Sequence, residues 1–290
     1  MVFMCLYWSE VRFGGSNKGV YNRTKLSQAL KPTRKRFHAL QYSPRVRGFH
    51  IVVQLKDVPG ALNSVLDLLR QQVDLTNTIS YNTSEGRAIS SIFAKAISRS
   101  VTEDSLKSAI AKSRFVEDYE VAGSKGGLVA DTFHEGIELG PGESLVAISV
   151  AGLSHMFRSL TNLFGTGGEV ILFEEGLAVG RANGEYLKKF LGASFVRNRL
   201  EDLATIYAAL GWGRATVAVE KRGKMISAKV EDCFECSGVK ERSQNCQFFR
   251  GHLVGIVSSV LGGSFRGEER KCRLKGDPHC EFYIERVGRD

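Results

Sequence analysis

Five of the chain's six cysteines lie in one stretch near its C-terminal end, between Cys233 and Cys280. The last two, Cys272 and Cys280, flank the turn-rich string Arg-Leu-Lys-Gly-Asp-Pro-His. Strand-like residues stand on both sides of this string, which predicts a β-hairpin. In a hairpin symmetric about Gly276 the two cysteines face each other, with Cβ atoms roughly 4.5–5.5 Å apart. That separation suits two thiolates that share a metal ion, and it nearly suits a disulfide.

A helix is predicted upstream, over residues 245–262, because apolar residues recur there at helical spacing. Cys246 falls in its first turn, where the helix dipole favours a thiolate. Together with the hairpin pair, Cys246 makes a three-ligand constellation for zinc, and Cys236, or Cys233, can complete a tetrahedral site. Three other side chains could take the fourth position: His252, His279 and Glu269.

The spacing of the cysteines leaves other interpretations open. Only Cys233 and Cys236 are two intervening residues apart, so the stretch lacks a repeated CxxC pattern. A free cysteine is often a small buried hydrophobe. From spacing alone, a metal site, free buried thiols and a disulfide all remain possible.

The order of residues in this stretch resembles the C-terminal half of the 4-vinyl reductase domain family. A cysteine opens a glycine-containing apolar helix, followed by Glu-x-x-Cys and then x-x-x-Gly-Asp-x-x-Cys-x-Phe-x-Ile. The matching residues are Cys246, Gly251, Gly255, Glu269, Cys272, Gly276, Asp277, Cys280, Phe282 and Ile284.

The resemblance implies a structural zinc ion held by Cys246, Cys272 and Cys280. Sensor members of the family add a Glu upstream of the hairpin; its position falls near residues 263–264, where no carboxylate stands, so Cys236 is expected as the fourth ligand. The family also implies a pocket for a small hydrophobic or aromatic molecule, although a filled core would use the same apolar residues. The expected lining residues are Met156, Phe157, Leu160, Phe164, Tyr186, Phe190 and Tyr207.

The net charge of +9 is concentrated at the N-terminal end. Residues 1–48 contain ten Lys or Arg and one Glu, so the rest of the chain is neutral. We therefore expect residues 1–47 to be a basic, poorly ordered arm. The alternative is contact with nucleic acid, which would have to use this arm.

Residues 48–123 are predicted to form a ferredoxin-like βαββαβ domain, because strand and helix patterns alternate in that order. The string after the first strand resembles the ACT domain, a regulatory module that often binds amino acids. The residues that match are Asp57, Pro59, Gly60 and Leu62. The glycine permits close backbone approach at a helix start, which suits a carboxylate, but a plain tight turn uses the same residues.

After a predicted linker at Gly123–Gly127, residues 128–290 are expected to form the second, 4-vinyl-reductase-like domain. Helices are predicted at 152–165, 177–192 and 197–211, and residues 168–176 are predicted to form a short buried strand. The fold class of the whole chain is therefore α+β, with helices packed on an antiparallel sheet in the second domain.

No Walker A loop, dinucleotide fingerprint or nucleophile elbow is present, and the histidines stand alone in the sequence. The sequence therefore favours a cytoplasmic, ligand-sensing regulatory protein, expected to be a homodimer, over an enzyme. The alternatives are a vinyl-group reductase acting on a tetrapyrrole, and a protein-interaction scaffold. No run of eighteen or more apolar residues or basic leader predicts a membrane span or export.

Overall fold

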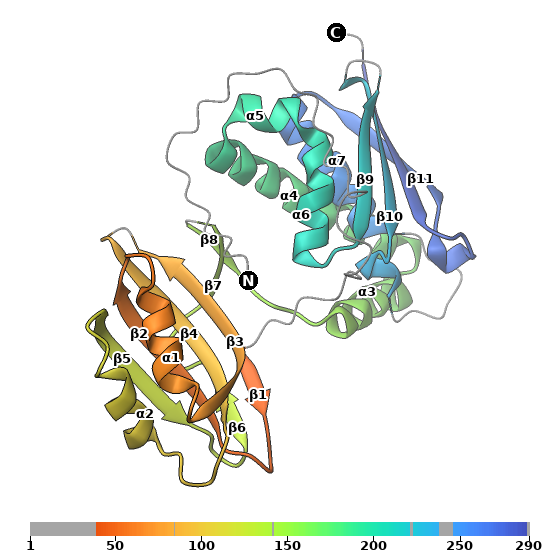
Figure 1. The fold of residues 1–290 in the computed structure, drawn as a ribbon. Helices are drawn as coiled ribbons and strands as arrows, with labels where there is room; N and C mark the ends of the chain where they lie inside the picture. The colour runs from red at the N-terminus through yellow and green to blue at the C-terminus, as the bar shows by residue number, and fades with distance from the viewer. Residues whose placement is uncertain (1–38, 84, 141, 221–222, 238–245, 289–290) are drawn as a thin grey trace. The chain divides into compact units, whose positions relative to one another are not determined.

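The structure is a computed structural model that describes residues 39–83, 85–140, 142–220, 223–237 and 246–288. The chain divides into two compact units, Met1–Glu135 and Gly136–Asp290. Each unit has its own four-stranded sheet and its own hydrophobic core (Figure 1). Most of the predicted basic arm lies outside the described residues.

The first unit contains the predicted βαββαβ order. Its elements are β2 (Gly48–Lys56), α1 (Ala61–Leu69), β3 (Val73–Asn82), β4 (Arg87–Ala96), α2 (Glu103–Ile110) and β5 (Val116–Gly123). The strands form an antiparallel sheet in the order β3-β4-β2-β5. Alternate residues of β2, from Phe49 to Leu55, are almost fully buried against α1 and α2. The predicted ferredoxin-like arrangement is confirmed.

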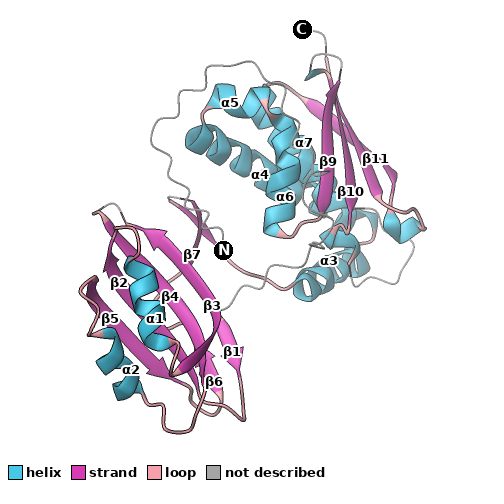
Figure 2. Cartoon of the chain, viewed as in Figure 1, coloured by secondary structure: helices cyan, strands magenta, loops and turns pink. Residues whose placement is uncertain are grey.

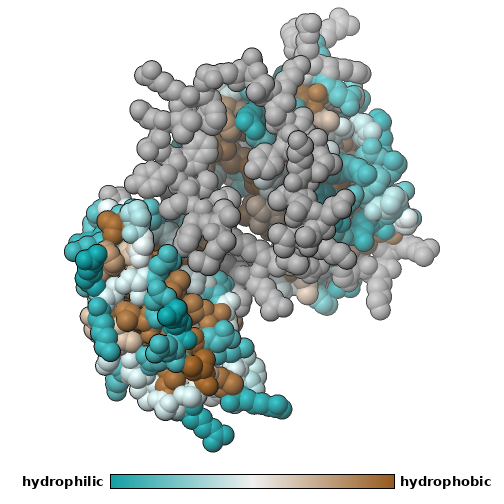
Figure 3. Space-filling model, viewed as in Figure 1, coloured by the Kyte–Doolittle hydropathy of each residue, from teal (hydrophilic) through white to brown (hydrophobic). Residues whose placement is uncertain are grey.

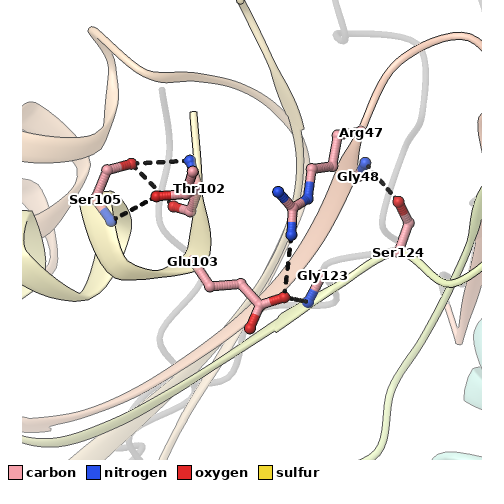
Figure 4. A network of polar contacts seen from close by, with 7 residues as sticks. All are labelled: Arg47, Gly48, Thr102, Glu103, Ser105, Gly123 and Ser124. Atoms are coloured by element: carbon pink, nitrogen blue, oxygen red, sulfur yellow. Dashed lines mark hydrogen bonds and ion pairs between the residues drawn. The ribbon is translucent and has the colours of Figure 1, made fainter. Parts of the chain in front are cut away.

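Helix α2 begins at a reciprocal cap that ties it to the sheet (Figure 4). The Thr102 hydroxyl accepts the backbone N–H of Ser105, and the Ser105 hydroxyl accepts the backbone N–H of Thr102, both at 3.1 Å. Glu103, in the first turn, accepts the backbone N–H of Gly123 at 3.1 Å and pairs with Arg47 at 3.4 Å. The cap therefore fixes both the start of α2 and its position beside β5.

The end of the predicted arm forms β1 (Leu40–Tyr42), which pairs antiparallel with β6 (Leu128–Ala130). The expected linker Gly123–Gly127 is therefore the connection between β5 and β6, and Gly126 and Gly127 have positive φ values of 59° and 85°. The division between the units falls later than predicted, after Glu135. The sequence did not reveal this because two strands of three residues each carry almost no periodic signal.

The second unit has an antiparallel sheet in the order β11-β12-β10-β9, with helices packed on it (Figure 2). Its strands are β7 (Ile137–Gly140), β8 (Glu143–Leu145), β9 (Arg214–Glu220), β10 (Met225–Glu231), β11 (Phe265–Lys271) and β12 (Cys280–Arg286). Its α-helices are α3 (Val150–Phe164), α4 (Thr166–Leu191), α5 (Ala193–Asn198), α6 (Leu203–Leu210) and α7 (Gln247–Leu261). The α+β fold class is confirmed.

Residues 168–176, predicted as a strand, are part of the long helix α4. The run of β-branched and aromatic residues there favours a strand locally, but tertiary packing overrides it. Gly176 and Gly180 of α4 face α7, where a Cβ on either glycine would collide with the backbone of α7; Gly251 and Gly255 of α7 show the same relationship to α4. The two helices therefore pack backbone to backbone.

The described helices include none with the length and hydrophobicity that a membrane span needs. On the visible face of the first unit, apolar side chains are interspersed with polar ones (Figure 3).

Candidate metal centre

Five buried cysteines from three separate segments meet at one end of the second unit's sheet. Two follow β10, one of them in a short 3-10 helix (Phe234–Cys236); one precedes α7; and two flank the turn between β11 and β12. We call these residues the thiol cluster: Cys233, Cys236, Cys246, Cys272 and Cys280. All five are free thiols.

The hairpin places its two cysteines as the sequence predicted. Lys271 pairs with Glu281, so Cys272 and Cys280 are the next residues toward the turn. The Asp277 carboxylate accepts the backbone N–H of Cys272 at 2.9 Å, which holds the turn closed. The predicted β-hairpin with opposed cysteines is confirmed.

Four of the sulfur atoms lie at the separations that a single tetrahedral ion requires. Cys236 Sγ is 3.1 Å from Cys246 Sγ, 3.3 Å from Cys280 Sγ and 3.9 Å from Cys272 Sγ. Cys246 Sγ is 3.7 Å from Cys280 Sγ and 3.9 Å from Cys272 Sγ. Thiolates bound to one zinc ion through bonds of about 2.3 Å lie roughly 3.8 Å apart.

Two further donors border these four sulfurs. Cys233 Sγ lies 3.9 Å from Cys246 Sγ, and the Glu269 carboxylate reaches the opposite side of the cluster. The donors form two overlapping sets whose ligand atoms lie within 4.8 Å of one another. One set is Cys233, Cys236, Cys246 and Cys280; the other is Cys246, Glu269, Cys272 and Cys280.

Glu269 is the carboxylate that the sequence reasoning sought near residues 263–264. Its register shifts at Arg270, where β11 bulges against β12, so that Glu269 and Cys272 both turn toward the cluster despite their three-residue spacing. Glu269 Oε2 accepts the backbone N–H of Cys246 at 2.8 Å, whereas the buried Oε1 has no hydrogen-bond partner. The Glu-x-x-Cys string was the signal that could have identified it.

A second buried carboxylate, Glu235, fixes the start of α7. Its oxygens accept the backbone N–H groups of Phe248 at 3.1 Å and Phe249 at 2.8 Å. Burial raises the pKa of Glu235 to about 8, against the effect of these two hydrogen bonds. Burial, with Cys272 nearby, also raises the pKa of Glu269 to about 8.

The thiols share their protons unequally. Hydrogen bonds from neighbouring thiols, that of Cys233 first, lower the pKa of Cys280 to about 5. Hydrogen bonds from Cys236 and Cys246 lower the pKa of Cys272 to about 7. Contacts with the other cysteines, Cys233 first, raise the pKa of Cys246. The cluster therefore carries thiolate charge near neutral pH, which favours a divalent cation.

His252, one of the possible substitute ligands, has both ring nitrogens engaged elsewhere. Nδ1 is 3.1 Å from the Tyr207 hydroxyl, and Nε2 is 3.1 Å from the Asn183 amide nitrogen. Burial lowers the pKa of His252 to about 3, so the ring is neutral. His279, the other candidate, lies 3.9 Å from Glu281 and is in neither donor set.

The residues predicted to line a pocket are found in separate environments. Phe157 is buried and stacks on Phe248, with ring centroids 5.2 Å apart. Tyr186 stacks on Phe190 at 5.6 Å, and Tyr207 lies in the core beside His252. Leu160 packs at the border of the core, whereas Met156 and Phe164 are exposed. Binding at these residues stays a prediction.

The ACT-like string surrounds the start of α1. Gly60, with φ of 88°, is the residue before the helix, and the Asp57 carboxylate accepts a hydrogen bond from Asn82 at 3.1 Å. Pro59 is exposed, and Leu62 packs at the edge of the core. Amino-acid binding at this turn stays a prediction.

Two histidines that are isolated in the sequence meet in the first unit. His134 Nδ1 is 2.7 Å from the Asp131 carboxylate, and His50 Nε2 is 3.7 Å from it. His50 Nε2 also lies 2.8 Å from the Ser91 hydroxyl. This contact holds the segment after β6 against the sheet face that carries His50.

Comparisons with known proteins point to the stretch that contains the thiol cluster. Residues 226–286, from β10 to the end of β12, match the family model of the 4-vinyl reductase domain. An uncharacterized protein of Methanocaldococcus jannaschii is 29% identical over 122 residues, which are 42% of this chain and 66% of that protein. The similar stretch thus spans slightly less than two thirds of that relative.

Among solved structures, similar folds occur in three proteins of different description. The phenol-responsive sensory domain of the transcription activator PoxR is 18% identical, with a TM-score of 0.40, over 49% of this chain and 77% of that one. A trafficking protein particle complex subunit 3 from Naegleria fowleri, covalently bound to palmitic acid, is 17% identical with a TM-score of 0.38, over 47% and 93%. A vinyl-4-reductase family protein from Methanocaldococcus jannaschii is 15% identical with a TM-score of 0.32, over 50% and 98%.

Proposed function

We propose that this chain is a cytoplasmic, ligand-sensing regulatory protein whose second unit is stabilised by a structural zinc ion. The observation that supports the proposal most directly is the thiol cluster, which lies inside the stretch matched by the 4-vinyl reductase domain model. The second unit would take a small hydrophobic or aromatic molecule, and the first unit would have a regulatory role.

The donors fit zinc on chemical grounds. Buried thiolates with separations near 3.8 Å are typical of a closed structural site, and zinc prefers sulfur ligands in tetrahedral geometry. Cys246, Cys272 and Cys280 would supply three ligands, with Cys236 as the fourth and Glu269 as its competitor. When bound, zinc would contribute binding free energy to folding by linking the segments around β10, α7 and the β11–β12 turn.

The proposed ligand seat is the polar pair in the aromatic core, Tyr207 and His252. The Asn183 amide donates to Nε2 of the neutral histidine, so Nδ1 carries the proton and donates to the Tyr207 oxygen. The Tyr207 hydroxyl proton can then donate to a ligand. Trp212 lies 4.6 Å from the His252 ring and Phe249 lies 5.3 Å from the Tyr207 ring, so the surroundings suit an aromatic molecule.

Metal content tests the zinc proposal. Full-length protein should retain zinc after dialysis against a weak chelator, and Cys246→Ser, Cys272→Ser and Cys280→Ser should each lose it together with thermal stability. Cys5→Ser, which changes the sixth cysteine, is the matched control and should keep both. Protein without zinc, with wild-type stability in the three serine variants, would refute the proposal.

A thermal-shift screen with phenols, other aromatic compounds and amino acids tests the ligand proposal. A compound that binds the native state raises the melting temperature in a concentration-dependent way. Tyr207→Phe should weaken the shift produced by a hydroxyl-bearing aromatic compound, whereas the control Tyr119→Phe in the first unit should not change it. Absence of any shift across the screen would contradict the sensing function.

A homodimer is also part of the proposal, because the second unit exposes apolar side chains on α3 and α4. Leu163, Phe164 and Val170 are 73%, 58% and 60% exposed. Exposed apolar residues gathered on neighbouring elements mark association surfaces. Light scattering on the full chain should give a dimer mass, and Val170→Glu should convert it to a monomer; a monomer in the wild type would remove this part of the proposal.

A further inference from the structure

The centre has more donors than one ion can use. A tetrahedral zinc ion takes four ligands, but the five thiols and the Glu269 carboxylate offer six. If the four closest sulfurs hold one ion, two donors remain: the fully buried Cys233 thiol and the Glu269 carboxylate. The buried Glu269 Oε1 then keeps no partner, which is costly for a carboxylate.

The six donors divide into two complete sets that share one pair. Cys246 and Cys280 belong to both sets, and their sulfur atoms lie 3.7 Å apart. That distance matches the edge of a zinc–thiolate tetrahedron, about 3.8 Å. Two tetrahedra that share this edge would use every donor once, apart from the two bridging thiolates.

We infer that the thiol cluster and Glu269 hold two divalent metal ions, bridged by the thiolates of Cys246 and Cys280. Cys233 and Cys236 complete the coordination of one ion, and Glu269 and Cys272 complete that of the other. This inference rests on the metal centre of the proposed function and extends it to a second ion.

Charge supports a second ion. One divalent cation leaves most of the negative charge of six donors uncompensated, so the two unused donors would have to stay protonated in a buried site. A second cation allows the remaining donors to ionise and bind. The 3.9 Å between the Cys236 and Cys272 sulfurs is the observation that favours one ion, since end ligands of different ions lie farther apart.

Native mass spectrometry of the full chain, loaded with excess zinc and then dialysed against a weak chelator, distinguishes the two arrangements. Two zinc ions per chain are expected in the wild type and in the control Cys5→Ser, and one is expected in Cys233→Ser. Cadmium-113 resonance spectra of wild-type protein loaded with cadmium should show two signals split by coupling through the bridging sulfurs, and this readout needs no variant.

Each outcome decides between the proposals. One zinc ion in the wild type, with a single cadmium signal, overturns the two-ion centre but leaves the zinc-stabilised unit of the proposed function intact. No bound metal overturns both. Iron with acid-labile sulfide in the purified protein also overturns the inference, because an iron–sulfur cluster would then occupy the thiols.

Discussion

Gly180 of α4 lies directly against the backbone of His252 in α7. A Cβ on Gly180 would collide with the carbonyl oxygen of His252. Gly176 approaches Phe248 in the same way, one helical turn earlier. Because both contacts involve backbone atoms, no side-chain rotation can relieve them, and the separation between the helices depends on these glycines.

Gly180→Ala should therefore destabilise the second unit. The added methyl group overpacks the α4–α7 contact, which costs about 1–3 kcal/mol or more, and the higher helix propensity of alanine offsets only about 1 kcal/mol. Gly167→Ala in the same helix is the control, since its Cβ would only reach ordinary contact, 3.8 Å from Phe164. Urea unfolding should show a loss of stability for Gly180→Ala alone; equal stabilities would contradict backbone-to-backbone packing.

The buried His252 should make the protein less stable in acid. Its pKa is about 3 in the folded chain, against about 6.5 when unfolded, so the unfolded state binds more protons as the pH falls below about 6.5. Stability is thus lost as the pH falls. Between about pH 7.5 and pH 5.5 the loss from this residue is about 1.4 kcal/mol.

The variant His252→Gln should lose this part of the pH dependence. Urea unfolding of the wild type and the variant at both pH values measures it, and any effect of pH on metal binding is common to the two proteins. His155→Gln changes an exposed histidine of α3 and should keep the wild-type pH dependence. An unchanged slope in His252→Gln would show that the buried ring does not resist protonation.

Local signals predicted much of the fold and part of the centre. The βαββαβ order and the hairpin that brings Cys272 opposite Cys280 follow from periodicity and turn residues. The approach of Glu269 depends on a bulge at Arg270, which leaves no mark in the strand pattern. His50 meets Asp131 only through long-range folding, so their contact could not be read from spacing.

The same limit explains the helix that was predicted as a strand. The apolar run from Val170 to Phe173 has strand propensity, and only packing against α7 makes it helical. Glycines at Gly176, Gly180 and Gly184 recur every four residues, which is a helical spacing, but the boundary of the predicted helix cut this series after its first member.

The cap of α2 predicts a small, specific effect in the first unit. Thr102→Ala removes the hydroxyl that accepts the Ser105 N–H, and should lower the stability of this unit by about 1 kcal/mol. Thr102→Ser keeps an equivalent hydroxyl and should remain within a few tenths of a kcal/mol of the wild type. Chemical unfolding of both variants measures the difference; equal losses would mean that the threonine acts through its methyl group.

Metal removal should loosen one unit and spare the other. A strong chelator would leave the segments around Cys236, Cys246 and Cys272 joined only by packing, with buried thiolate charge no longer compensated. Amide hydrogen exchange should therefore accelerate at residues 233–237, at the start of α7 and at the β11–β12 turn. The sheet β3-β4-β2-β5 is the internal control, since its strands carry none of the cluster's donors. Equal exchange in both units with and without chelator would show that the thiol cluster does not use a metal ion to stabilise the fold.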